Sequence, residues 1–194
     1  MEFILASHNQ KKLDELRQIL DGFHVQVIPL PAGAPEPEEN GSTFAANAQI
    51  KAHAAAAFTG KAAIADDSGL CVDALGGAPG IYSARYADGT DQGNNQKLLC
   101  EMEAIPDGHR QARFICAVAC VLPDGREFTV QGECEGEILR QLHGTGGFGY
   151  DPLFYVPTYG CTFGELPQQI KNTISHRAKA LSAFAETLKS YIQE

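Results

Sequence analysis

The sequence predicts a mixed α/β fold. Short apolar stretches alternate with amphipathic stretches of helical period along the first 65 residues, and a long antiparallel hairpin is indicated at 110–139. Alternation of this kind favours strands joined by helices, whereas the long hairpin disfavours a simple doubly wound parallel sheet. Because the chain has 194 residues and no clean linker, we expect one domain, residues 1–194, with a substantial hydrophobic core.

The first predicted elements are a strand, a helix and a second strand. The apolar stretch 2–6 is typical of a short buried strand. The helix that follows at 7–20 places four apolar side chains on one face: Leu13, Leu16, Ile19 and Leu20. Residues 24–30 then favour a second strand. The N-terminus is therefore expected to form a strand-turn-helix-strand unit.

A loop rich in proline and acid at 31–42 separates this unit from a second helix. We expect that helix to run from about Thr43 to Phe58, with Ser42 or Thr43 as its N-cap. A buried strand at 61–65 follows and runs directly into the sequence DDSGL. Two adjacent carboxylates therefore stand at the end of an apolar strand, where α/β enzymes place active groups.

The second half of the chain contains the longest predicted strands. Both arms of the hairpin at 110–139 are rich in β-branched or aromatic residues, and Asp124 and Gly125 form its turn. The chain closes with a helix that starts near Ser175. Its apolar stripe consists of Leu181, Phe184, Ala185, Leu188 and Ile192.

Composition and charge disfavour several classes of partner. The formal net charge of -9 argues against nucleic acid, because affinity there comes largely from Lys and Arg side chains that neutralise phosphates. No apolar run approaches the roughly 20 residues that cross a bilayer, so no membrane partner is expected. Glu2 and the lack of a basic segment before the first apolar stretch favour a cytoplasmic protein. An anionic small molecule would need local positive charge or a divalent cation.

The six cysteines form neither a C-x-x-C pair nor a zinc-type pattern with histidine. Free, mostly buried thiols are therefore expected. Cys116 and Cys120 are four residues apart in a predicted strand, which places both on one face as core residues.

The turn after the first strand is a candidate anion site. Ser7 and Asn9 lie in this turn, and Lys12 lies in the first turn of the helix, where free N–H groups and the helix dipole favour an anion. Asn9 as a simple N-cap and Lys12 as a solvated side chain are the alternative. Lys12 is four residues before Leu16, so it shares a side with the apolar stripe.

Asn47 and Lys51 are one turn apart on the second helix, with Glu39 just upstream. They form either part of a site or a surface pair.

Asp66 and Asp67 must point to opposite faces of an extended chain, so only one can reach a given cleft, and the other is expected to anchor the backbone. A carboxylate here could hold Mg²⁺ or accept a proton from water, but Asp-Asp-Ser-Gly is also a good turn sequence.

Two further segments are unusual. GTGGFGYDP at 144–152 surrounds Phe148 with glycines, and the ring either plugs the core or faces a ligand. In ISHRAKAL, His176 and Arg177 open a helix whose dipole favours negative charge. Either a ligand rich in acceptors or a nearby surface carboxylate would compensate for them.

These segments together resemble the inosine triphosphate pyrophosphatase family. The ordered set covers nearly the whole chain and comprises Ser7-x-Asn9-x-x-Lys12, ADDSGL, LGGAPGIYSARYA, GTGGFGYDPLF and ISHRAKAL. The resemblance implies a long, bent, mixed sheet with flanking helices, in two lobes around a central cleft, usually as a homodimer. It also implies Mg²⁺-dependent hydrolysis of ITP, dITP and XTP to the monophosphate and pyrophosphate, which clears non-canonical purine nucleotides from the pool.

The resemblance implies roles for the matching residues. Ser7, Asn9 and Lys12 would line the triphosphate site. Glu39 and Asp67 would bind the metal ion, with the adjacent Glu38 as an alternative to Glu39. The other substrate contacts would be Lys51, Ser68, Phe148, Gly149, Tyr150, Asp151, Lys171, Ser175, His176 and Arg177.

Asp67 would also orient the water that attacks the α-phosphorus in line, with Lys12 and Lys51 assisting the departure of pyrophosphate. Phe148 would stack on the base, and stacking accepts any base. Discrimination against adenine would come from donors in 175–177 that bond the C6 carbonyl of hypoxanthine or xanthine.

Two other functions remain compatible with these segments. One is a pyrophosphatase of the same topology with another modified-base preference, and the other is a non-catalytic nucleotide sensor. A sensor would have lost the metal acid or the base, yet both carboxylates are present. A P-loop kinase or an NAD enzyme is disfavoured, because the glycine fingerprints of both are missing.

Overall fold

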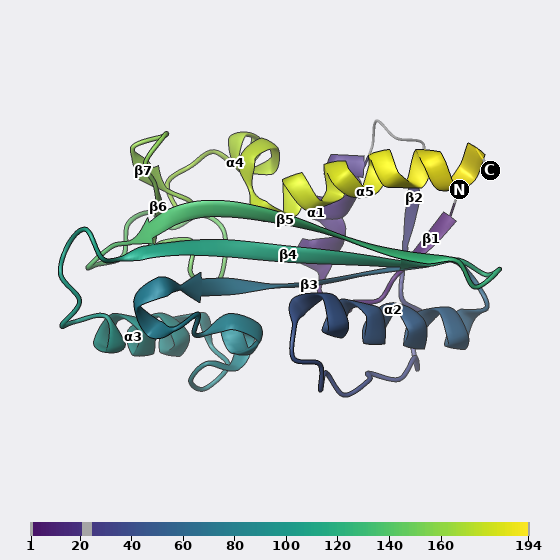
Figure 1. The fold of residues 1–194 in the computed structure, drawn as a ribbon, viewed down its shortest axis with the longest axis horizontal. Coiled ribbons are helices and arrows are strands. Elements are labelled where there is room, and N and C mark those ends of the chain that lie inside the picture. Colours follow the sequence, from purple (N-terminus) through teal and green to yellow (C-terminus); the bar gives the residue numbers. More distant parts are fainter. Residues whose placement is uncertain (1, 21–24, 194) are drawn as a thin grey trace. The chain divides into compact units, whose positions relative to one another are not determined.

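The computed structural model describes residues 2–20 and 25–193 (Figure 1). Residue 24, the expected start of the second strand, and the side chains of Ile19 and Ile192 lie outside the described residues. The elements are β1 (Glu2–Leu5), α1 (Gln10–Leu20), β2 (Gln26–Pro29), α2 (Phe44–Thr59), β3 (Ala63–Val72), η2 (Asp73–Leu75), η3 (Gly80–Arg85), α3 (Asp91–Glu101), β4 (Gln111–Val121), β5 (Glu127–Ile138), β6 (Phe154–Val156), β7 (Cys161–Thr162), α4 (Gln168–Ile174) and α5 (His176–Gln193).

The strands form one mixed sheet in the order β2-β1-β3-β4-β5-β6-β7. β1 pairs in parallel with β2 and β3, whereas β5 and β6, and β6 and β7, pair antiparallel. The predicted hairpin connects β4 and β5 through a turn in which Gly125 has a φ of 87°. The mixed α/β class is therefore confirmed.

The chain divides into two compact units. The first unit comprises Met1–Asp67, Cys116–Gly132 and His176–Glu194, and the second comprises Ser68–Ile115 and Glu133–Ser175. β3, β4 and β5 each contribute residues to both units. The expected central cleft between two lobes stays a prediction.

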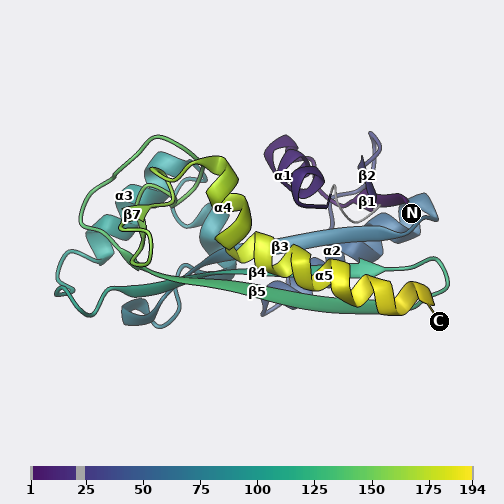
Figure 2. The same cartoon turned by 90° about the horizontal axis from the view of Figure 1, so that it is seen from above.

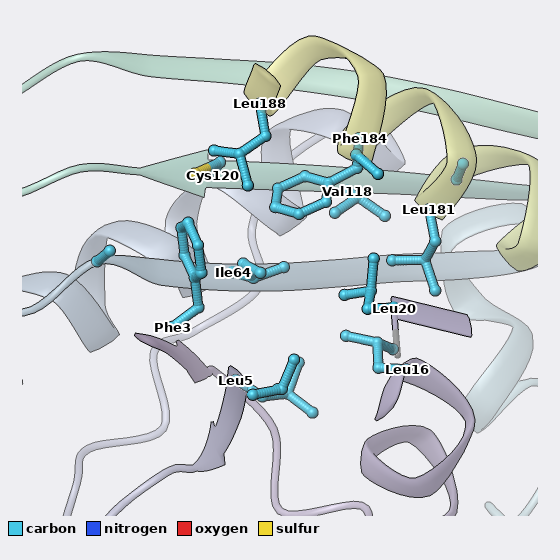
Figure 3. Packing of buried hydrophobic residues seen from close by; sticks show 14 of the residues in the cluster. Phe3, Leu5, Leu16, Leu20, Ile64, Val118, Cys120, Leu181, Phe184 and Leu188 are labelled. Atoms are coloured by element: carbon cyan, nitrogen blue, oxygen red, sulfur yellow. The ribbon is translucent and has the colours of Figure 1, made fainter. Parts of the chain in front are cut away.

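The core of the first unit lies between α1, α5 and the sheet. Leu16 and Leu20 of α1 and Leu181 and Phe184 of α5 meet Ile64 in one buried cluster (Figure 3). The Phe184 ring contacts the rings of Phe3 and Phe128, with centroids 6.0 and 5.5 Å apart. The apolar stripes predicted for both helices therefore face the same core.

α2 and α5 cover opposite faces of the sheet in this unit (Figure 1). α2 packs through Ala55 against Ile4 and Ala63. Of the two predicted caps, Thr43 is the N-cap, because its hydroxyl accepts the N–H of Ala46 at 3.1 Å.

α5 lies along β5 (Figure 2). The two elements approach closely at Gly132, where a Cβ would collide with the backbone of His176 and Ala180. A side chain at position 132 would therefore push the first turns of α5 away from the strand.

The second unit has its own core and contains the elements that the sequence did not predict. Its buried cluster includes Leu98 of α3, Phe114 of β4 and Phe154 of β6. α3 buries Asn94 and Asn95 beside Leu98, so its inner face lacks the apolar period that marks a helix in sequence. β3 also extends to Val72, so the expected end of this strand at residue 65 is wrong, Asp66 and Asp67 lie within the strand, and the turn alternative for DDSGL is wrong as well.

All six cysteines are free, and Cys116 and Cys120 lie buried in the core of the first unit. Within the described ranges, no helix combines the length and the apolar character that crossing a bilayer requires.

Replacement of Phe184 by alanine is expected to lower the free energy of unfolding by about 3–5 kcal/mol, because a fully buried ring is lost and leaves a cavity. Urea unfolding followed by circular dichroism measures this change. Phe58→Ala is the control, since Phe58 is 48% exposed. Equal losses in the two variants would contradict the assignment of this core.

Candidate active site

Asp66 is the centre of a buried charge cluster in the first unit. Its Oδ2 lies 3.1 Å from Nζ of Lys12 and 3.3 Å from Nη2 of Arg177. Burial alone would raise the pKa of Asp66, but the positive charges of Lys12 and Arg177 outweigh it and hold the pKa below its ordinary value. Asp66 therefore stays ionised. The expectation that the aspartate facing away from the cleft anchors the backbone is wrong for Asp66, because its partners are two cationic side chains.

The sequence around α1 explains how Lys12 reaches this carboxylate. The side-chain oxygen of Asn9 accepts the N–H of Lys12 at 3.3 Å, and the hydroxyl of Ser7 accepts the N–H of Asn9 at 3.1 Å. Asn9 therefore caps α1 and fixes its first turn. The cap and the candidate site are parts of one arrangement, since the capped turn directs Lys12 onto Asp66.

Asp67 is the centre of a second cluster, on the opposite side of the strand. Its Oδ1 lies 3.3 Å from Nζ of Lys51, and its Oδ2 accepts a hydrogen bond from Asn47 at 3.2 Å. Asn47 and Lys51 share a face of α2, as their spacing predicts, and the surface-pair alternative is wrong because Asn47 is fully buried. The side-chain oxygen of Asn47 also accepts the N–H of Gly41 at 2.9 Å. α2 thereby connects the acidic loop to β3.

Glu39 joins the Asp67 cluster through Lys51. Its Oε1 lies 3.3 Å from Nζ of Lys51, and its side chain is 31% exposed. Glu38 is exposed, and its backbone carbonyl accepts the N–H of Asn40. One ammonium group therefore lies within 3.3 Å of carboxylates from two separate segments.

The two adjacent aspartates differ in their electrostatics. Burial raises the pKa of Asp67, and Glu39 adds to the rise, while Lys51 opposes it. Burial lowers the pKa of Lys51, but the three carboxylates Asp67, Asp66 and Glu39 outweigh it and raise the pKa overall. Neighbouring carboxyls whose pKa values are moved apart can serve different chemical roles, one as a fixed charge and one as a base.

Glu39 and Asp67 are the residues that could hold a metal ion. Within residues 2–20 and 25–193, no group of three or more His, Cys, Asp or Glu side chains could do so. Mg²⁺ is commonly held by one or two carboxylates together with water and substrate phosphate oxygens. Two carboxylates that already share the positive charge of Lys51 fit such a site.

The Phe148 segment lies in the second unit and forms a separate candidate site. The ring is half-buried, and Nζ of Lys171 lies 4.9 Å from its centroid. Lys171 is itself buried and lies 2.6 Å from Oδ2 of Asp151, which also accepts the N–H of Phe148 at 2.8 Å. Gly147 has a φ of 73°, and a Cβ there would collide with this carboxylate. The glycine at 147 is therefore needed for the Asp151 contact.

Tyr150 is the aromatic residue of this segment that lies in the core. It is 4% exposed, and its hydroxyl donates to the carbonyl of Ser83 at 2.8 Å. Gly149 contacts two side chains that the sequence did not single out, Asp91 and Asn95 of α3. The sequence signal for this contact was the pair of adjacent asparagines in 91–101, Asn94 and Asn95. Their spacing alone does not distinguish a helix face that holds another segment from an ordinary polar face.

The remaining predicted residues, apart from Ser68 on β3, lie at the junction of α4 and α5. Ser175 is fully buried, and its N–H donates to the carbonyl of Lys171 at 3.0 Å. His176 and Arg177 open α5 and are buried. The charge of Arg177 is balanced by the buried Asp66. Ser68 follows Asp67 on β3 and is half-buried in the second unit.

Comparisons with known proteins agree on one family. The Ham1 family model matches residues 3–187. A Desulforamulus reducens protein named dITP/XTP pyrophosphatase is 53% identical over 100% of this chain and 99% of that protein, and a Geobacter sulfurreducens protein of the same name is 48% identical over 95% of each. A solved structure of a HAM1 protein from Coxiella burnetii has a TM-score of 0.90 and 44% identity, covering 98% of this chain and 99% of that chain. The chain therefore belongs to the Ham1 family.

Proposed function

We propose that this chain hydrolyses non-canonical purine nucleoside triphosphates, dITP, ITP and XTP, to the nucleoside monophosphate and pyrophosphate. The observation that carries this proposal is the pair Asp66 and Asp67, with cationic partners on both sides of one strand. Such a pair supplies a fixed negative charge and a carboxylate able to accept a proton, beside lysines suited to phosphates. The names of the relatives, dITP/XTP pyrophosphatase, support the choice of substrate.

Asp67 is assigned as the base that orients the attacking water. Its raised pKa favours proton acceptance, and Asn47 holds the carboxylate in place. Asp66 is assigned as the anchor that holds Lys12 and Arg177. The roles therefore follow from the two environments, since the residues are chemically identical.

Lys12 and Lys51 are assigned to the triphosphate, together with Ser7 and Asn9 at the start of α1. The N-terminus of a helix favours an anion, because its first N–H groups have no partner within the helix. Glu39 and Asp67 are assigned as the ligands of Mg²⁺. When bound, the metal ion neutralises charge on the phosphate oxygens of the leaving pyrophosphate.

Phe148 is assigned to stacking on the nucleobase, with polar contacts to the base from Gly149, Asp151, Lys171, Ser175, His176 and Arg177. Tyr150 is assigned a supporting role instead, because its hydroxyl is bonded to the backbone of Ser83 within the core.

A homodimeric assembly in the cytoplasm belongs to the same proposal, and sedimentation equilibrium tests the dimer.

Asp67→Asn is expected to reduce kcat/KM for dITP by at least about 10²–10⁴-fold, because the amide cannot accept the proton of water. Pyrophosphate release measures the rate, and circular dichroism checks the fold. Asp14→Asn, which changes an exposed carboxylate on α1, is the control and should retain full activity. Near-normal hydrolysis of dITP by Asp67→Asn would rule out the assignment of the base.

Asp66→Asn is expected to lower the free energy of unfolding at pH 7 by about 3–5 kcal/mol, because the buried Arg177 and the partly buried Lys12 lose their common counterion. The folded-state pKa of Asp66 is lowered, so its contribution is present above the unfolded value of about 3.9 and is lost as the pH falls below it. Urea titrations of both proteins at pH 7 and pH 3 should therefore show a smaller difference at pH 3. A difference independent of pH would contradict this account.

Removal of divalent cations with EDTA is expected to abolish pyrophosphate release, and excess Mg²⁺ should restore it. We expect dITP and XTP to be hydrolysed much faster than dATP, dGTP, dUTP or dCTP. Faster turnover of a pyrimidine nucleotide would favour a related pyrophosphatase with another base preference. Binding of dITP without hydrolysis, with or without Mg²⁺, would favour a nucleotide sensor.

A further inference from the structure

α3 holds the backbone of Gly149 through two side chains. Oδ2 of Asp91 accepts the N–H of Gly149 at 2.8 Å, and Nδ2 of Asn95 donates to the carbonyl oxygen of Gly149, also at 2.8 Å. Asp91 and Asn95 are four residues apart, so they lie on one face of the helix. Both backbone polar groups of the residue after Phe148 are therefore bonded to a single helix.

The contact from Asn95 has only one possible orientation. Nδ2 also donates to the backbone carbonyl of Asp91 at 2.8 Å, and both of its partners are carbonyl oxygens, which only accept. Asn95 is 5% exposed, so water competes little for these bonds. The amide therefore ties Gly149 to the first turn of α3.

The backbone of Phe148 is fixed on its other side as well. Its own N–H donates to Oδ2 of Asp151, the same oxygen that lies 2.6 Å from Nζ of Lys171. On the far side of Gly149, the hydroxyl of Tyr150 is bonded to Ser83. Three consecutive residues, 148 to 150, are thus each bonded to the rest of the second unit. The backbone that carries the Phe148 ring is therefore held in place, and the main motions left to the ring are rotations about its own side-chain bonds.

We propose that Asp91 and Asn95 are positioning residues that hold Phe148 as a preorganised stacking surface for the nucleobase. α3 thereby sets the affinity for the base without touching it. The inference rests on the proposed function, in which Phe148 stacks on the base. The hydrogen bonds of Asp91 and Asn95 together form a clamp on Gly149. A ring on a backbone that is already held in its binding conformation loses less entropy when the base binds, so loss of this clamp should weaken binding more than it slows chemistry.

Asn95→Asp is the sharpest variant, because it keeps the shape of the side chain and replaces the donor with an oxygen that faces two carbonyls. We expect KM for dITP to rise about tenfold, within the range of one base-stacking contact, while kcat changes less than twofold. Gln92→Ala, on the exposed side of the same helix, is the control and should change neither constant. Asp91→Ala tests the other half of the clamp at an exposed position, so it serves if Asn95→Asp does not fold.

A second measurement does not depend on catalysis. The chain contains no tryptophan, so Phe148→Trp gives a single fluorophore at the proposed stacking position. In the absence of nucleotide, addition of Asn95→Asp to this variant should lower the fluorescence anisotropy and increase quenching by acrylamide. Unchanged anisotropy, quenching and KM in a folded Asn95→Asp protein would overturn the clamp. Failure of the wild-type protein to hydrolyse dITP would overturn the proposed function instead, and the fluorescence result would still decide on the clamp.

Discussion

The buried contact of Asp66 with Lys12 and Arg177 is the constraint on which the rest of the first unit depends. It joins β3 to the first turns of α1 and α5, two helices that are separated by most of the sequence. A carboxylate in this position is tolerated only because two cations compensate for its lost hydration. The same contact leaves Asp67 to face the other side of the strand, where Lys51 and Asn47 meet it.

Local periodicity predicted much of this arrangement. Strand alternation placed Asp66 and Asp67 on opposite faces, and helical spacing placed Asn47 and Lys51 together, and both expectations are confirmed. The partners of Asp66 could not be found this way, because Lys12 and Arg177 are 54 and 111 residues away. The resemblance to a family, which the comparisons confirm, supplied residues that spacing alone left undecided.

α3 is a helix that the sequence did not predict. Its inner face carries Asn94 and Asn95, whose buried amides donate to the backbone carbonyls of Ser83 and Gly149 in neighbouring segments. A hydrophobic pattern cannot reveal a helix whose packing depends on amide hydrogen bonds. The Phe148 segment was singled out for its glycines, yet the side chains that hold it came from this unpredicted helix.

Gly132 has a consequence for the position of Arg177. Val130 lies two residues before it on the same face of β5 and carries a side chain. A shift of α5 that brought Val130 against the helix backbone would place this side chain where only a hydrogen atom fits. The bare position therefore acts as a steric stop on that side, and it helps to fix the register at which the Arg177 guanidinium of α5 meets Asp66 of β3.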